Sequence, residues 1–114
     1  MEADSAYTFA ELFKKQCQER PEQIAVVSPG ENLALTFTSL SSRVDVLTQL
    51  LASEGVLAQD RVAVCLGNVV AFVECFLALS RLKAIAIPID TSYSPPEIET
   101  ILSDSGASFF LLRE

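Results

Sequence analysis

The chain has 114 residues, enough for one domain or for part of a larger one. Half of the residues are apolar and 20% are charged, which excludes a disordered chain and favours a packed core. The net charge is −7 and no run of five basic residues occurs, so nucleic acid is not an expected partner. No apolar stretch is long enough for a membrane span, and the acidic leader at residues 1–7 does not read as a signal peptide. The cytosol is therefore the expected location.

The mean hydropathy of +0.36 is high for a small soluble domain. One explanation is a parallel sheet covered by helices, because its strands are apolar on both faces. The other is a surface that residues of a missing partner should cover. The composition does not choose between them.

Cysteine and histidine usage limits the possible chemistry. The chain has three cysteines and no CxxC pair, so neither a disulfide framework nor a zinc site is expected. Cys65 and Cys75 lie in apolar runs and are predicted to be core thiols, whereas Cys17 is predicted to be partly exposed. The absence of histidine excludes Ser-His-Asp and Cys-His catalysis and histidine-based metal sites.

The first half of the chain predicts a helix, a β-hairpin and a second helix. Apolar residues spaced by three or four predict a helix over residues 8–20, begun by a Thr8–Glu11 capping box and ended by Pro21. Strands are predicted over residues 23–28 and 33–37, joined by a turn at residues 29–32. Thr38 is expected to begin a helix over residues 39–54, and Gly55 is its expected C-cap. The expected apolar face of this helix consists of Leu40, Val44, Leu47, Leu50 and Leu51.

The second half alternates apolar strands with helices. Strands are predicted over residues 61–66, 84–89 and 108–112. A nearly all-apolar helix is predicted from residue 69 to about residue 83, and a shorter one over residues 97–103 after two prolines. This order is a βαβαβ unit, and right-handed crossovers would place the three strands in one parallel sheet. The predicted fold class is therefore α/β, with a small hairpin beside a three-stranded parallel unit covered by helices.

The usual phosphate-binding loops of such units are absent. A single glycine, Gly67, follows the first parallel strand, where a dinucleotide site needs two or three, and no GxxxxGK[ST] motif occurs. The four glycines of the chain each fit a turn or a cap: Gly30, Gly55, Gly67 and Gly106.

Several charged residues are candidates for acid–base chemistry by type alone. Asp90 ends a strand at its carboxyl end, where ligand sites of α/β folds lie, but it is expected to cap the following turn. The other charged candidates are expected at turns, helix starts or helix ends: Asp60, Glu97, Glu99, Asp104, Arg81 and Lys83. No two carboxylates are spaced as a general acid and base. We therefore predict no catalytic, cofactor-binding or metal-binding residue in the chain.

Six segments, in order, resemble motifs of the AMP-forming adenylate ligases, which include acyl-CoA synthetases and adenylation domains of nonribosomal peptide synthetases. Residues 78–90 (ALSRLKAIAIPID) are similar to the family's second core motif, ALLKAGAAYVPLD, without a gap. The other five are residues 9–27, 35–40 (LTFTSL, similar to L(T/S)YxEL), 60–64 (DRVAV), 92–95 and 101–107 (ILSDSGA). Lys83 stands where the family motif has glycine, Ala86 where it often has tyrosine, and Ser39 where it often has glutamate.

The resemblance implies a two-step activity for a whole family enzyme. ATP, with Mg²⁺, and a carboxylate give an acyl-adenylate, and a thiol of CoA or of a carrier protein then takes the acyl group. The family residues that do this chemistry are absent from these 114 residues. The chain is therefore expected to be an N-terminal subdomain over residues 8–114, without activity alone and completed by the remainder of the ligase.

The alternative is a stand-alone protein that keeps the subdomain fold and binds a partner without catalysis. Under either hypothesis, the isolated chain has an unpaired edge strand and apolar helix faces without neighbours. Self-association of the isolated chain is therefore also expected.

Overall fold

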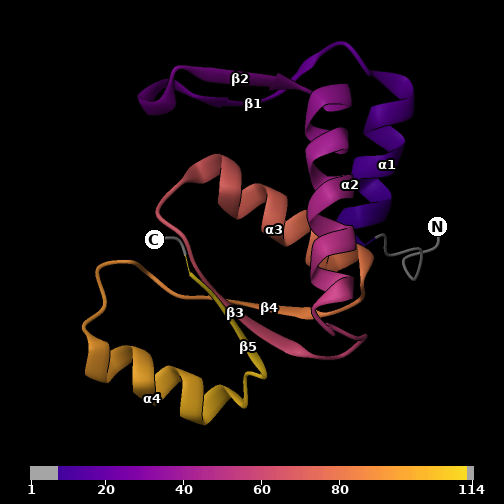
Figure 1. The fold of residues 1–114 in the computed structure, drawn as a ribbon. Coiled ribbons are helices and arrows are strands. Elements are labelled where there is room, and N and C mark those ends of the chain that lie inside the picture. Colours follow the sequence, from indigo (N-terminus) through magenta and orange to yellow (C-terminus); the bar gives the residue numbers. More distant parts are fainter. Residues whose placement is uncertain (1–7, 113–114) are drawn as a thin grey trace, which may run out of the picture.

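The computed structural model of the chain describes residues 8–112, in which a three-stranded parallel sheet has helices on both of its faces (Figure 1). Its strands are β3 (Arg61–Cys65), β4 (Ile85–Pro88) and β5 (Phe109–Leu112), in the order β4-β3-β5. Val62 of β3 pairs with Ala86 on one side and with Phe109 on the other. The predicted α/β class and the βαβαβ unit are both confirmed.

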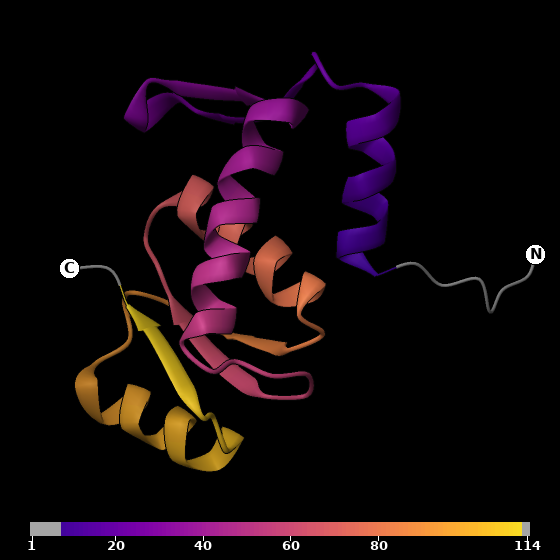
Figure 2. The same cartoon turned by 45° about the vertical axis from the view of Figure 1, so that its right-hand side comes forward.

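The two crossover helices cover opposite faces of this sheet. Helix α3 (Val69–Arg81) connects β3 to β4, and helix α4 (Pro95–Ser105) connects β4 back across β3 to β5. These connections run in opposite directions over the sheet, so crossovers of the same hand place their helices on opposite faces. Figures 1 and 2 both show α4 alone on the side away from the other helices.

The first half of the chain completes the layer that contains α3. Helices α1 (Phe9–Glu19) and α2 (Phe37–Ser53) lie on that side, and α2 packs along α3 (Figure 2). Ion pairs from Arg43 to Glu74 and from Arg81 to Asp45 also join α2 to α3. The predicted hairpin forms a separate antiparallel sheet of β1 (Ile24–Ser28) and β2 (Leu33–Thr36). Its turn is the 3-10 helix η1 (Pro29–Glu31), followed by Asn32 in the left-handed conformation, with φ of 52°.

The helix starts depend on side-chain caps, and one was assigned wrongly from the sequence. The Thr8–Glu11 capping box is present as predicted. Helix α2, however, begins at Phe37 rather than Ser39, because the Thr36 hydroxyl accepts a hydrogen bond from the Ser39 N–H at 3.1 Å. The Thr38 hydroxyl instead donates to the Pro21 carbonyl at 2.9 Å, so it holds the preceding loop and caps nothing.

Two further helix bounds differ from the prediction. Helix α3 ends at Arg81, two residues before the predicted end, because Lys83 has left-handed backbone geometry. Helix α4 is longer than predicted and starts at Pro95, because Ser94, the residue before the two prolines, caps it in a capping box with Glu97.

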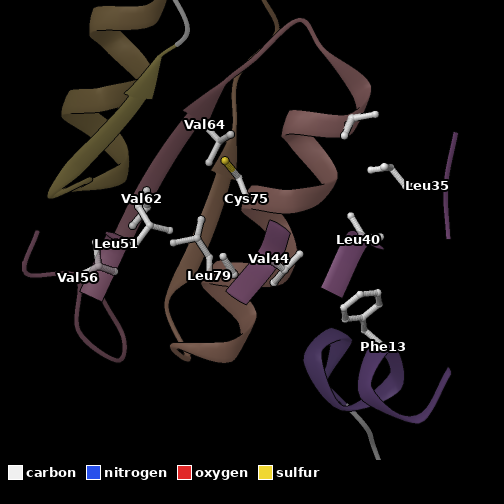
Figure 3. Close-up of a cluster of buried hydrophobic side chains, with 12 residues drawn as sticks. Phe13, Leu35, Leu40, Val44, Leu51, Val56, Val62, Val64, Cys75 and Leu79 are labelled. Atoms are coloured by element: carbon white, nitrogen blue, oxygen red, sulfur yellow. The ribbon is translucent and has the colours of Figure 1, made fainter. Parts of the chain in front are cut away.

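The core is divided between the two faces of β3. Val62 and Val64 point into a cluster with Val44 of α2 and Leu79 of α3 (Figure 3). The alternate side chains of β3, Ala63 and Cys65, pack with Ile89 and with α4 on the opposite face. The predicted burial of Cys65 and Cys75 is confirmed, and Cys17 is partly exposed as predicted.

Both explanations for the high hydropathy therefore have a structural counterpart. Strand β3 is apolar because helices cover both of its faces. Yet large apolar side chains remain exposed on the helices and the edge strands. Leu50 is one of them, because it lies about 80° around α2 from the stripe that contains Leu40, Val44, Leu47 and Leu51.

We expect Leu79→Ala to lower the free energy of unfolding by about 2–5 kcal/mol, because Leu79 is completely buried and its loss leaves a cavity. Leu50→Ala is the matched control, since Leu50 is 54% exposed, and it should cost less than about 1 kcal/mol. Urea denaturation followed by circular dichroism measures both. Equal losses would contradict the described core.

Candidate functional site

The carboxyl edge of the parallel sheet is where a ligand site of this kind of fold is expected. Two loops meet there: residues 66–68 after β3 and residues 89–94 after β4. They are in contact, since a Cβ atom added to Gly67 would lie 3.6 Å from the Thr91 methyl carbon. That distance is an ordinary van der Waals contact, so loop packing does not require glycine at position 67.

Asp90 behaves as the sequence predicted and caps a turn. Its carboxylate accepts a hydrogen bond from the Ser92 N–H at 2.9 Å, and its carbonyl accepts one from the Tyr93 N–H at 3.1 Å. Hydrogen bonds from the Ser92 backbone and side chain lower the pKa of the Asp90 carboxyl. An exposed carboxylate with a lowered pKa is a poor proton acceptor at neutral pH, so it is unsuited to general base catalysis.

The amino termini of the two crossover helices are already occupied. The Asn68 side chain accepts from the Ala71 N–H at 2.8 Å and donates to the Glu31 carboxylate of the hairpin turn. Glu97 and Ser94 close the start of α4, with the Ser94 N–H donating to Glu97 at 2.7 Å. Both helix starts, where an anion would otherwise bind, therefore have internal acceptors and a carboxylate beside them.

The remaining charged candidates do not converge. Asp60 lies at the opposite, amino edge of the sheet from Asp90, and its carboxylate accepts from the Leu57 N–H at 2.8 Å. Glu99 and Asp104 are exposed on α4. Within residues 8–112, no group of three His, Cys, Asp or Glu side chains could hold a metal ion.

Lys83 has an unexpected structural role. Its φ of 61° is left-handed, and its N–H donates to the Ser80 carbonyl at 3.0 Å, while the Ala84 N–H donates to Leu79 at 2.9 Å. This pair of bonds is a Schellman motif, which ends helix α3. The Lys83 carbonyl then accepts from the N–H of Gln59 at 2.8 Å, which joins the end of α3 to the loop before β3. The prediction of a simple cation at a helix end was therefore incomplete.

An apolar groove runs between α2, α3 and the end of β5. Its lining includes Leu50 of α2, Cys75 of α3, and Leu111 and Leu112 of β5. Burial raises the pKa of the Cys75 thiol to about 11, with a smaller contribution from Glu74, so the thiol stays protonated at neutral pH. The groove can bury apolar groups but offers no nucleophile. The sequence did not locate it, because periodicity assigned Leu50 to the core.

The comparisons with known proteins bear on this arrangement. A family model described as AMP-binding enzyme matches residues 13–114. The chain belongs to this AMP-binding enzyme family. Within residues 8–112, no helix is both long and apolar enough to cross a membrane.

Curated relatives come from both branches of the superfamily. The chain is 30% identical over 96 residues to the long-chain-fatty-acid–CoA ligase FadD13 of Mycobacterium tuberculosis, covering 84% of this chain and 19% of the relative. It is 31% identical over 106 residues to gramicidin S synthase 2 of Brevibacillus brevis, covering 93% of this chain and 2% of the relative. The chain thus spans a fifth or less of the length of these relatives.

Solved structures of the family have the same fold. The N-terminal domain of FACL13 from M. tuberculosis superposes with a TM-score of 0.87 at 28% identity, covering 92% of this chain and 26% of that one. The N-terminal subdomain of NpsA from Klebsiella oxytoca superposes with a TM-score of 0.86, covering 92% of this chain and 27% of that one. At 20% identity, the second likeness concerns the fold alone.

We expect Lys83→Gly to raise the free energy of unfolding by about 0.5–1 kcal/mol, because glycine adopts the left-handed geometry without the Cβ penalty. Gly55 ends α2 with the equivalent bonds and a φ of 100°, and nothing lies near its missing Cβ. Gly55→Ala is the control and should lower stability by about 1 kcal/mol. Chemical denaturation measures both variants, and a destabilised Lys83→Gly would refute the assigned strain.

We also expect the Asp90 carboxyl to titrate below the usual aspartate pKa of about 3.9. A lowered folded-state pKa means that its contribution to stability is present above the unfolded-state pKa and is lost as pH falls through the folded-state value. An NMR titration of the side-chain carboxyl carbon measures the midpoint. A midpoint for Asp90 at or above about 3.9 would argue against the turn.

Proposed function

We propose that the chain is the N-terminal structural portion of an ATP-dependent, AMP-forming ligase of carboxylic or amino acids, and that it is not catalytic alone. The observation that carries the proposal is family membership combined with length. The family match spans residues 13–114, which is nearly the whole chain. The chain, however, covers only about a quarter of the N-terminal domains that share its fold. In this proposal residues 8–114 form one piece of such a domain, preceded by a leader at residues 1–7.

The complete ligase would form an acyl-adenylate and pyrophosphate from ATP and an acid, and would then form a thioester. Relatives named as a CoA ligase and as a peptide synthase support either CoA or a carrier-protein thiol as the acceptor. A solved relative titled as an artificially fused adenylation–PCP di-domain is consistent with the second choice, although its 20% identity supports the fold alone. The remainder of the ligase is the proposed partner, and the cytosol is the proposed location.

The described residues, 8–112, do not fit ATP or Mg²⁺. The Ala71 N–H at the start of α3 is bonded to Asn68, and the Glu31 carboxylate beside it would repel a phosphate. At the start of α4, Glu97 carries a second carboxylate. We therefore assign no step of the reaction to this chain. Its proposed role is to supply the sheet and helices on which the later parts of the domain pack.

The apolar groove favours a second candidate function, in which the chain stands alone and binds a partner. An open groove lined by Leu50, Leu111 and Leu112 suits apolar side chains of another protein. The two candidates differ in what the gene encodes after residue 114: the first requires a continuing reading frame that contains a phosphate loop.

The test is ATP–pyrophosphate exchange with a panel of fatty acids and amino acids. We expect the 114-residue chain to give no exchange above a protein-free blank, because no described residue can orient the phosphates. Full-length FadD13 with a long-chain acid is the positive control, as its name indicates this substrate class. Reproducible exchange by the chain, lost on heat denaturation, would overturn the proposal.

A further inference from the structure

Helix α3 has no side that is suited to water. Only three of its side chains are polar, and each is bonded to a neighbouring helix. Glu74 and Arg81 form ion pairs with side chains of α2, and the Ser80 hydroxyl oxygen accepts a hydrogen bond from the Ala10 N–H of α1 at 3.0 Å. A helix that is apolar all round is typical of the core of a large protein or of a membrane span. With 13 residues, α3 is too short for a span, so the core of a larger protein is the fitting environment.

On one side, α3 and the start of α1 form an apolar surface that we call the Phe76 patch. It consists of five side chains that line a hollow of about 210 Å³: Phe9, Phe72, Val73, Phe76 and Leu77. The Phe76 ring packs against the rings of Phe72 and Phe9, with centroids 5.1 and 5.8 Å apart. Phe9 is 64% exposed, and the other four side chains are half-buried. An occupant of this hollow therefore meets only apolar side chains.

Helix α4, on the opposite face of the sheet, has an ordinary outer surface. Its apolar side chains, Ile98, Ile101 and Leu102, pack against the sheet. Its exposed side chains are polar or charged: Glu97, Glu99, Thr100, Ser103 and Asp104. A helix with one apolar face and one polar face is typical of a surface layer. The two crossover helices thus differ, and only α3 has an outward side that calls for further cover.

We propose that the Phe76 patch is an internal packing surface of the complete ligase, covered by apolar side chains from ligase residues outside these 114. This inference rests on the proposed function. The N-terminal domain of FACL13 shares the fold, and the chain covers only 26% of it, so the larger part of such a domain is available to supply the cover. The added layer then lies on the α3 side of the sheet, and α4 stays at the surface.

The size of the patch favours a covalently tethered occupant over a separate one. Its five side chains, four of them half-buried, expose far less than the roughly 800 Å² that each partner contributes to a stable complex. The hollow is also smaller than the roughly 300 Å³ at which small-molecule pockets begin. A segment of the same chain needs less area, because tethering raises its effective concentration. A second copy is disfavoured further, since each copy carries a net charge of −7.

The first experiment measures how reactive a cysteine placed in the patch is, in a Cys17→Ser background. Phe9→Cys is made in the 114-residue chain and in the full-length ligase, and its labelling by a maleimide is followed by mass spectrometry of the peptide. We expect labelling to be at least about tenfold slower in the ligase, because cover excludes the reagent. Thr100→Cys, at an exposed position of α4, is the matched control and should react equally fast in both proteins.

The second experiment compares unfolding midpoints in urea for Phe9→Glu in the same two proteins. In the 114-residue chain the shift should be small, because Phe9 is exposed and a carboxylate is favourable in the first turn of a helix. In the ligase the carboxylate would be buried, so the midpoint should fall by at least about 0.5 M more than in the chain. Thr100→Glu is the control and should shift both midpoints equally.

Several outcomes would overturn the proposal. They are equally fast labelling of Phe9→Cys in both proteins, equal protection of Thr100→Cys in the ligase, and equal midpoint shifts for Phe9→Glu. Slow labelling of Phe9→Cys in the 114-residue chain would also overturn it, since a second copy or the leader would then cover the patch. The proposed function fails on a separate result, exchange activity of the 114-residue chain. A reading frame that ends after residue 114 would overturn both.

Discussion

The burial of β3 on both faces is the constraint on which the rest of this fold depends. Its alternating side chains fill two separate clusters: Val62 and Val64 face α2 and α3, and Ala63 and Cys65 face α4. A strand that is apolar on both faces must be covered twice. Two crossovers of one hand achieve this only when β4 and β5 lie on opposite sides of β3. The central position of β3 therefore determines which helix covers which face.

Polar side chains are used mainly to begin helices and to close turns. Thr8, Thr36, Asn68 and Ser94 each accept a hydrogen bond from a backbone N–H at a helix start, and Asp90 does the same in a turn. Each of these side chains satisfies a donor that would otherwise lack a partner. Little polar chemistry is then left at the carboxyl edge of the sheet. This is the physical basis for the scaffold role that we propose for the chain.

The amino edge shows how tertiary demands override residue preference. Lys83 keeps a left-handed conformation at a position where the family motif has glycine, and it meets Gln59, which also has a positive φ of 73°. The bond between these two residues and the bond from Ile85 to Asp60 align β4 with β3. The register of β4 against β3 depends on these two bonds. Lys83 therefore keeps its left-handed conformation despite the backbone strain.

The sequence by itself determined the α/β class, the order of elements, the Thr8 capping box and the Asp90 turn, because these follow from local periodicity and short-range hydrogen bonds. The start of α2 at Phe37 and the conformation of Lys83 depended on tertiary structure, since competing partners such as Pro21 and Gln59 are distant in sequence. The exposure of Leu50 and the strand order β4-β3-β5 were also decided there. Strand order and packing, which no local pattern encodes, establish which apolar residues are left uncovered.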